Sequence, residues 1–313
     1  MQALKKNDLV ALLAPAGFIT DELPVLAAEQ WLASVGLKAI RGSHVLGRKG
    51  VFSGSDRERL FDLQEAIDNP EVKAIWAVRG GYGAMRIMSQ LNFKKLKEQP
   101  KWLIGFSDIT AFHNQWQLLG LPSIHGMMPV QFAKSPNDTV AGLEGLRKAL
   151  MGEKLEYVLA PNKHNKMGTA EGVLTGGNLT LLQSLMGTPY QVDTKGKILF
   201  IEDVGEYVYR IDRLLYSMKL AGAFEHLKGL IVGGFTDMKE NDTPFGKSIP
   251  QMILDVTKGK KYPILFDFPA GHFPDNQALI LGQKVQMIIT PKQSQITFPQ
   301  LLTDFPAKAG TNF

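Results

Sequence analysis

A serine between an apolar segment and an amphipathic segment is the first residue of this chain that could do chemistry. The run 101–106 predicts a buried strand, and apolar residues recur at helical spacing from Ile109 to Leu119. Ser107 lies in the turn between them, where its hydroxyl could act as a nucleophile and the first free N–H groups of the helix could stabilise an oxyanion. Serine is also a favoured helix N-cap, and Ile109 stands where a nucleophile elbow usually has glycine, so a capping role stays open.

A serine nucleophile needs a base that takes its proton. His272 is the best placed of the six histidines, because Phe268-Pro-Ala-Gly-His-Phe-Pro274 fixes an irregular, rigid backbone around it. His125 ends an apolar run and is a weaker second candidate, whereas His113 is expected on the polar side of the helix after Ser107. A histidine in an ordinary surface turn is the structural alternative for His272.

The base in turn needs a carboxylate that orients it. Glu202 and Asp203 follow the apolar run 198–201, which predicts a strand. Glu202 is the better candidate, because it directly continues that strand and would lie at its carboxyl end. An acidic pair that caps the following helix is the alternative.

Three glycines stand in the four residues 80–83, between a predicted strand and a predicted helix, so the backbone of this loop can approach a ligand closely. The loop could supply an oxyanion N–H alongside that of Asp108. A dinucleotide-binding loop is the rival interpretation, but Arg86 stands where its third glycine belongs. No two histidines are three or four residues apart and His-Glu-x-x-His is absent, so we expect neither a metal centre nor a cofactor.

The composition is typical of a globular protein with two domains, since 313 residues with 44% hydrophobic content can form two cores of ordinary size. We expect a cytoplasmic protein without a membrane partner, because no apolar run approaches the roughly 18 residues of a membrane span and no signal-peptide pattern is present. The absence of cysteine fits a reducing compartment. The net charge of +5 is spread over small lysine groups, which does not favour nucleic acid binding.

The first half of the chain alternates short β-like runs with amphipathic segments, which predicts a doubly wound parallel sheet. Strands are expected near 9–14, 37–41, 72–78 and 102–106, and helices near 21–35, 56–69, 82–91 and after Ser107. In such sheets ligands bind at the carboxyl ends of the strands, where the loops 79–83 and 106–108 fall.

A polar stretch with proline and glycine breaks this alternation and predicts a linker at 159–171. We therefore expect an N-terminal domain at 1–158 that carries Ser107. Residues 172–313 mix helix-like and strand-like segments, which predicts a second, smaller α/β domain that carries Glu202 and His272.

In their order and spacing, four segments together resemble the serine LD-carboxypeptidases, a family that includes murein tetrapeptide carboxypeptidases and microcin C immunity peptidases. These segments are Arg79–Gly83, Gly105–Thr110, Ile201–Gly205 with Tyr209–Arg213, and Gly271–His272. The likeness extends over nearly the whole chain. It implies a flavodoxin-like N-terminal domain, a smaller mixed α/β domain and a homodimer.

The resemblance also implies roles for particular residues. Ser107 would be the nucleophile, His272 the general base and then acid, and Glu202 the group that orients His272. The backbone N–H groups of Gly81 and Asp108 would form the oxyanion hole.

The implied reaction is hydrolysis, through an acyl-enzyme, of the amide between an L-configured centre and the terminal D-alanine of a murein tetrapeptide in peptidoglycan recycling. A substrate with a free carboxylate would need a cationic partner, and Arg79 is a candidate by position, with a local ion pair as the alternative. A microcin C-type peptidase acting on peptidyl-nucleotides, and a non-catalytic protein that binds nucleotides or muropeptides, are the alternative functions.

Overall fold

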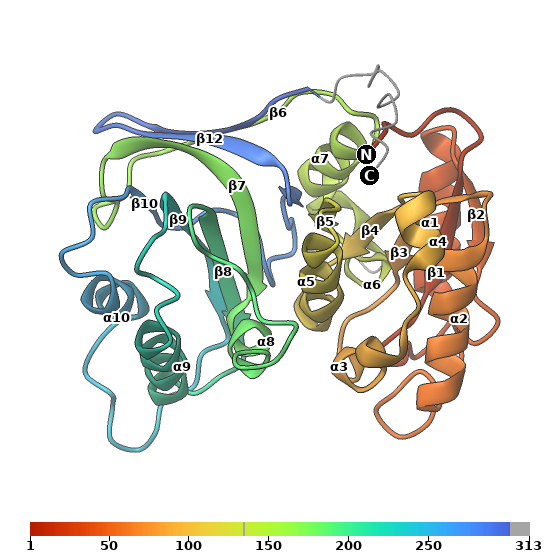
Figure 1. Cartoon of the computed structure of the whole chain (residues 1–313), viewed down its shortest axis with the longest axis horizontal. Helices are drawn as coiled ribbons and strands as arrows, with labels where there is room; N and C mark the ends of the chain where they lie inside the picture. Colours follow the sequence, from red (N-terminus) through yellow and green to blue (C-terminus); the bar gives the residue numbers. More distant parts are fainter. Residues whose placement is uncertain (134, 301–313) are drawn as a thin grey trace, which may run out of the picture.

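The computed structural model describes residues 1–133 and 135–300, and these form two β-sheets with helices around them (Figure 1). The first sheet has the strand order β11-β5-β4-β3-β1-β2. Its strands are β1 (Leu9–Leu13), β2 (Lys38–Arg41), β3 (Val72–Ala77), β4 (Trp102–Gly105), β5 (Ser123–His125) and β11 (Leu279–Leu281). Strands β1 to β5 pair in parallel, and β11 pairs antiparallel with β5. The parallel strands have the flavodoxin-like order 2-1-3-4-5, which confirms the predicted doubly wound sheet.

Helices cover both faces of this sheet, as its apolar strands require. They are α1 (Leu23–Ser34), α2 (Asp56–Asp68), α3 (Ala84–Ile87), α4 (Lys94–Glu98), α5 (Thr110–Leu118), α6 (Pro129–Phe132) and α7 (Val140–Leu150). The start of α2 is fixed by a capping box between Ser55 and Glu58. The helix predicted at 82–91 is shorter in the structure, because α3 ends at Ile87 and a 3₁₀ turn, Met88–Gln90, follows it.

Helix α5 lies between the first sheet and β7 of the second sheet, so both of its faces are buried (Figure 1). The expectation that His113 lies on a polar face of this helix is therefore wrong. His113 is fully buried, with Nδ1 at 2.8 Å from Ser123 Oγ and Nε2 at 2.9 Å from the Gly105 carbonyl oxygen.

The second sheet has parallel and antiparallel strands in the order β10-β9-β8-β7-β12-β13-β6. Its strands are β6 (Leu155–Leu159), β7 (Gly168–Asn178), β8 (Ile198–Val204), β9 (Gly229–Thr236), β10 (Ile264–Leu265), β12 (Lys284–Ile289) and β13 (Ser294–Phe298). Strands β7 to β10 pair in parallel, whereas β12 pairs antiparallel with β7 and β13, and β13 with β6. Its helices are α8 (Leu179–Ser184), α9 (Val208–Leu220) and α10 (Ile249–Val256).

The chain passes between the two sheets more than once. Strand β6 already belongs to the second sheet, and β7 begins at Gly168, inside the segment 159–171 that we expected as a linker. The chain later returns to the first sheet through β11. The division into domains at 159–171 stays a prediction. Within residues 1–133 and 135–300, no helix has the length and apolar character that membrane crossing requires.

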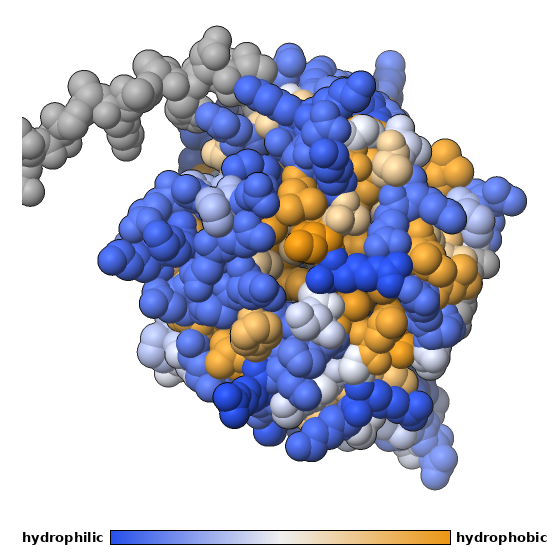
Figure 2. Space-filling model, turned by 90° about the vertical axis from the view of Figure 1, so that its right-hand side faces the viewer, coloured by the Kyte–Doolittle hydropathy of each residue, from blue (hydrophilic) through white to orange (hydrophobic). Residues whose placement is uncertain are grey.

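Apolar side chains gather on the outer face formed by α1, β2 and α2, which faces the viewer in Figure 2. The exposed apolar residues of these elements include Leu23, Leu26, Ile40 and Phe61. The edge strand β2 also carries Lys38 and Arg41, and Arg41 pairs with Glu22 and Glu29 of the α1 region. Charged side chains of this kind discourage a second strand from pairing with an exposed sheet edge.

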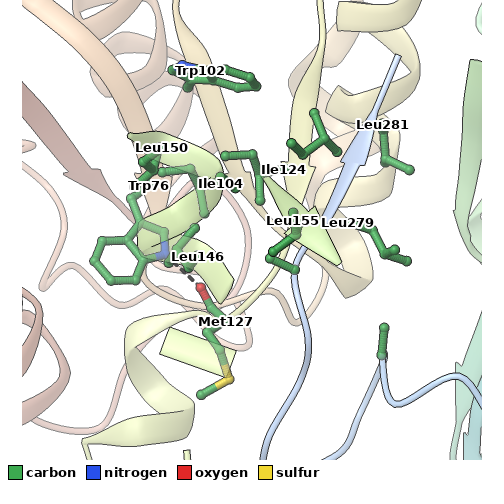
Figure 3. Close-up of a cluster of buried hydrophobic side chains, with 14 of the residues drawn as sticks. Trp76, Trp102, Ile104, Ile124, Met127, Leu146, Leu150, Leu155, Leu279 and Leu281 are labelled. Carbon is green, nitrogen blue, oxygen red and sulfur yellow. Dashed lines mark hydrogen bonds between the residues drawn. The ribbon is translucent and has the colours of Figure 1, made fainter. Parts of the chain in front are cut away.

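The first sheet is anchored by a buried cluster on one of its faces (Figure 3). Trp76, Ile104 and Ile124 project from neighbouring strands of the sheet into this cluster, and the Trp76 indole N–H donates to the Met127 carbonyl oxygen at 2.8 Å. The neighbouring residue Leu103 packs into a separate cluster on the opposite face, as the alternation of side chains along a strand requires. The carboxyl end of β4, which leads to Ser107, is thus held from both sides.

Candidate active site

Ser107 follows β4 in a backbone conformation that favours glycine, with φ of 62°. Among the described residues its hydroxyl makes no capping hydrogen bond to the turn Ser107–Ile109 that it begins, and its partner is a histidine instead. The capping alternative is therefore not what the structure shows. A strained residue between a strand and a helix places its side chain at the end of the sheet, as in a nucleophile elbow.

His272 lies between Ser107 and Glu202. Its Nε2 is 3.1 Å from Ser107 Oγ, and its Nδ1 is 2.7 Å from Glu202 Oε2. Its ring packs on Phe106, with 4.8 Å between the ring centroids. The structure thus brings together three residues that are far apart in the sequence, in the order serine, histidine, carboxylate.

Glu202 is fully buried in β8, so its carboxylate is shielded from water. The approach of His272 to this carboxylate depends on the preceding residue. Gly271 has φ of 118°, and a Cβ atom there would lie 2.8 Å from Glu202 Oε2. Only glycine allows the loop to come this close.

The neighbouring Asp203 bonds to the start of α8 and not to His272. Its carboxylate accepts hydrogen bonds from the N–H and hydroxyl of Thr180 and from the side-chain amide of Asn178, at 2.7 to 3.1 Å. Burial, together with the charge of Glu202, raises the pKa of Asp203 to about 6. Asp203 holds the start of α8, which leaves Glu202 as the partner of His272.

The environment of His272 raises its pKa above the usual 6.5. Burial is the largest single effect and lowers the pKa, because it disfavours the charged ring, but the hydrogen bond to Glu202 and the charges of Glu202, Asp203 and Asp237 together outweigh it. A base with a raised pKa accepts a proton more readily, provided that it is neutral at the working pH.

The glycine loop lies directly against Ser107. A Cβ atom on Gly80 would lie 3.3 Å from Ser107 Oγ, and the Gly80 carbonyl oxygen accepts from the N–H of Gly17 at 2.8 Å. Gly81 has φ of 97°. Within the described ranges, neither the N–H of Gly81 nor that of Asp108 donates to a backbone carbonyl outside helices and strands. Gly81 also lines the cavity that contains Ser107.

A cavity of about 630 Å³ opens at Ser107. Residues from both halves of the chain line it, among them Arg79, Gly81 and Val204 together with Ser107 and His272. It lies at the carboxyl ends of β3, β4 and β8, where the doubly wound pattern predicted a ligand site.

Arg79 is half-buried at the edge of this cavity, and its Nη1 donates to the Phe18 carbonyl oxygen at 2.5 Å. It forms no ion pair with an acid among the described residues, so the expected structural alternative, a local ion pair, is not found. A guanidinium at a cavity wall can bind a carboxylate through several N–H groups.

Two further polar residues, His125 and Asn276, lie close to the loop that carries His272. His125, the second candidate for the base, is fully buried, and its ring packs on Phe106, as the ring of His272 does. Asn276 was not singled out from the sequence. Its side-chain oxygen accepts from the N–H of Gly271 at 2.8 Å and fixes the loop that carries His272. Nothing in its local pattern distinguishes it from an ordinary turn asparagine.

Among the described residues, no group of three or more histidine, aspartate or glutamate side chains could hold a metal ion. Ser107, His272 and Glu202 instead have the mutual distances that a serine nucleophile, a histidine base and an orienting carboxylate require. Such a set can attack a carbonyl carbon.

Comparisons with known proteins agree with this arrangement. Residues 10–126 match the model of the LD-carboxypeptidase N-terminal domain, and residues 171–287 match that of the LD-carboxypeptidase C-terminal domain. A protein of Bacillus subtilis described as a probable murein peptide carboxypeptidase is 34% identical over 300 residues, which cover 94% of this chain and 93% of that protein. The murein tetrapeptide carboxypeptidase of Pseudomonas aeruginosa is 31% identical and covers 88% of this chain and 91% of its own.

Solved structures show the same fold. The crystal structure of a muramoyltetrapeptide carboxypeptidase from Oxalobacter formigenes superimposes with a TM-score of 0.84 at 29% identity, over 96% of this chain and 100% of that chain. The microcin C7 self immunity protein MccF has a TM-score of 0.83 over 96% of this chain and 99% of its own, but only 22% identity, so this likeness concerns the fold alone. The two domain models and the curated relatives place this chain in the LD-carboxypeptidase family.

Proposed function

We propose that this protein is a serine carboxypeptidase that releases the terminal D-alanine from murein tetrapeptides. The observation that carries the proposal is the hydrogen-bonded series from Ser107 through His272 to Glu202, at a cavity wall that also contains the glycine loop. The names of the full-length relatives support murein peptides as the substrate class. The homodimer that the resemblance implied and the cytoplasmic location expected from the sequence stay predictions.

In the proposed mechanism, His272 Nε2 takes the proton of Ser107 as Oγ attacks the carbonyl carbon of the scissile amide. The N–H groups of Gly81 and Asp108 donate to the oxyanion of the tetrahedral intermediate. His272 then gives its proton to the amine of the leaving D-alanine, and an acyl-enzyme on Ser107 remains. Water attacks this ester with His272 again as the base. Glu202 keeps the imidazole oriented and stabilises its charged form throughout.

The test of this function is the release of free D-alanine from L-Ala-γ-D-Glu-meso-diaminopimelate-D-Ala, followed by mass spectrometry. We expect release by the intact protein and none by Ser107→Ala. The same peptide with L-alanine at its end should stay intact, because the proposed site acts on a terminal D-residue. Cleavage of peptidyl-nucleotide amides without cleavage of the tetrapeptide would instead favour the microcin-type alternative, and binding without turnover would favour a muropeptide-binding protein.

Arg79 is proposed to bind the terminal carboxylate of the substrate. The Arg79→Gln variant should raise KM about 10- to 100-fold and change kcat much less, since a charge-assisted hydrogen bond contributes about 1.5–3 kcal/mol. The measurement compares the tetrapeptide with its C-terminal amide. The intact protein should discriminate strongly against the amide, and Arg79→Gln should not. Equal losses on both substrates would mean that Arg79 does not contact the carboxylate.

A further inference from the structure

A buried arginine lies next to the glycine loop. Arg59 is only 1% exposed, and in α2 it shares its burial with one other charged residue, Asp62. Its burial lowers its pKa, because desolvation disfavours the charged guanidinium, and the nearby Asp56 opposes this effect. Burying a charged side chain costs free energy of folding, so a buried arginine that made no stabilising contacts could be replaced by an apolar residue with little loss of stability. Its contacts therefore call for an explanation.

The guanidinium of Arg59 joins two loops of the candidate site. Its Nη1 donates to the Pro15 carbonyl oxygen at 2.7 Å and to the Gly83 carbonyl oxygen at 2.9 Å. Its Nη2 donates to Asp56 at 2.5 Å, which fixes the guanidinium from its other side. Helices α2 and α3 lie side by side (Figure 1), so Arg59 of α2 reaches the Gly83 carbonyl oxygen at the start of α3 directly.

Asp108 holds the other side of the same peptide unit. Its carboxylate accepts from the N–H of Ala84 at 2.8 Å, while Arg59 donates to the carbonyl oxygen of Gly83. The Gly83 carbonyl and the Ala84 N–H belong to one planar peptide group, so its orientation is fixed at both ends. A Cβ atom on Gly83 would lie 2.7 Å from Arg59 Nη1, so glycine is needed for this contact.

The held peptide unit is connected to both proposed oxyanion donors. It ends the loop that contains Gly81, and Asp108 itself follows Ser107 in the chain. The loop that Arg59 binds at Pro15 continues to Gly17, whose N–H donates to the Gly80 carbonyl oxygen at 2.8 Å. Arg59 therefore holds the glycine loop directly at Gly83 and indirectly at Gly80.

We propose that Arg59 and the Asp108 side chain are positioning residues that fix the Gly83–Ala84 peptide group and thereby aim the oxyanion donors at the carbonyl attacked by Ser107. This inference rests on the proposed function, because it assumes that Gly81 and Asp108 donate to an oxyanion. Arg59 would thus stabilise the transition state by positioning the oxyanion donors, without touching the substrate itself.

The test compares Arg59→Met with Arg57→Met. Arg57 lies on the same helix but is exposed, so its variant makes the same change of charge without touching the loop. We expect Arg59→Met to lower kcat about 10²-fold, the usual loss for one oxyanion donor, with KM within about threefold of the intact protein. Arg57→Met should behave as the intact protein. Arg59→Lys, which keeps the charge but cannot reach both carbonyl groups in the same way, should lose less than Arg59→Met.

A fluorophosphonate probe separates this inference from the proposed function, because it reacts with an activated serine without any peptide. We expect the probe to label Ser107 in the intact protein, and about 10²-fold more slowly in Arg59→Met. Equal labelling rates in folded Arg59→Met and Arg57→Met would overturn the inference and leave the nucleophile in place. No labelling of the intact protein would overturn the proposed function and the inference with it.

A structural role alone would give a different result. In that case Arg59→Met would have a lower Tm, but its folded fraction would react at the normal rate. If Arg59→Met does not fold, the same test can be made at the Ala84 N–H, the other end of the Gly83–Ala84 peptide group, with the variants Asp108→Asn and Asp108→Leu. Asparagine keeps an acceptor for the Ala84 N–H, so we expect kcat to fall much less with asparagine than with leucine. Equal losses for these two variants would overturn the inference.

Discussion

Replacing Ser107 by alanine is expected to lower kcat about 10⁶-fold, because removal of the nucleophile of a hydrogen-bonded triad costs about as much as removal of the whole unit. In the structure, Ser107 Oγ has His272 Nε2 as its partner at 3.1 Å, and a cavity opens beside it. The variant should keep its affinity for the tetrapeptide, since the proposed carboxylate partner Arg79 is unchanged. Single-turnover release of D-alanine and binding by calorimetry measure the two properties separately.

The left-handed backbone at Ser107 also affects the stability of variants at this position. With φ of 62°, serine and alanine are both strained here, and the left-handed conformation costs a residue with a Cβ atom about 1–2 kcal/mol. Ser107→Gly should therefore be more stable than Ser107→Ala by about 1 kcal/mol, although glycine also has more freedom in the unfolded chain. Denaturant unfolding of the two inactive variants provides the comparison. A glycine variant that is less stable than the alanine variant would mean that the left-handed backbone of Ser107 stores no strain.

The doubly wound sheet could be predicted because its strands are short apolar runs separated by amphipathic segments, and this pattern is local. The three residues at Ser107 could be found for a related reason, since each follows an apolar run or stands in a rigid loop. Their mutual contact could not be derived from these patterns. Ser107 and His272 are 165 positions apart, and only the family resemblance connected them.

Other features depend on tertiary placement that no local pattern contains. The spacing of apolar residues in α5 predicts one polar face, but α5 is packed between the two sheets, and His113 is buried with its ring bonded to Ser123 and Gly105 of the first sheet. Strand β11 joins the first sheet as an edge strand, although β10 and β12, which flank it in the chain, belong to the second sheet. Only the folded chain shows that Ser107 has a left-handed backbone and that its hydroxyl meets a histidine.

The burial of Arg59 could be predicted from its local pattern, but its partners could not. It precedes the buried Leu63 by four residues and so falls on the inner face of a helix, which is a signal that the sequence contains. The carbonyl groups that it binds lie in loops 44 and 24 positions away, and only the folded chain brings them together. A charged residue at buried-face spacing is therefore worth noting in a sequence even where its partners cannot be named.

Replacing Glu202 by glutamine is expected to lower kcat about 10⁴-fold and to move the acid limb of the kcat/KM profile to lower pH. Glu202 Oε2 lies 2.7 Å from His272 Nδ1, so Nδ1 carries the proton and Nε2 is left free to accept from Ser107. The side-chain amide of glutamine can donate to Nδ1, which leaves Nε2 protonated and unable to act as the base, and the loss of about 10⁴-fold is typical of this change.

The pH effect of the same substitution has a definite sign. Neutral His272 is the active form, so activity falls as the pH falls through its pKa. The hydrogen bond and charge of Glu202 raise that pKa above 6.5 against the opposing effect of burial, so the intact protein should lose activity with a midpoint above pH 6.5. Without the negative charge, burial dominates and the midpoint should move down. An unchanged midpoint in Glu202→Gln would show that another acid sets the pKa of His272, and the buried Asp203 would be the first to replace, because its charge also acts on this histidine.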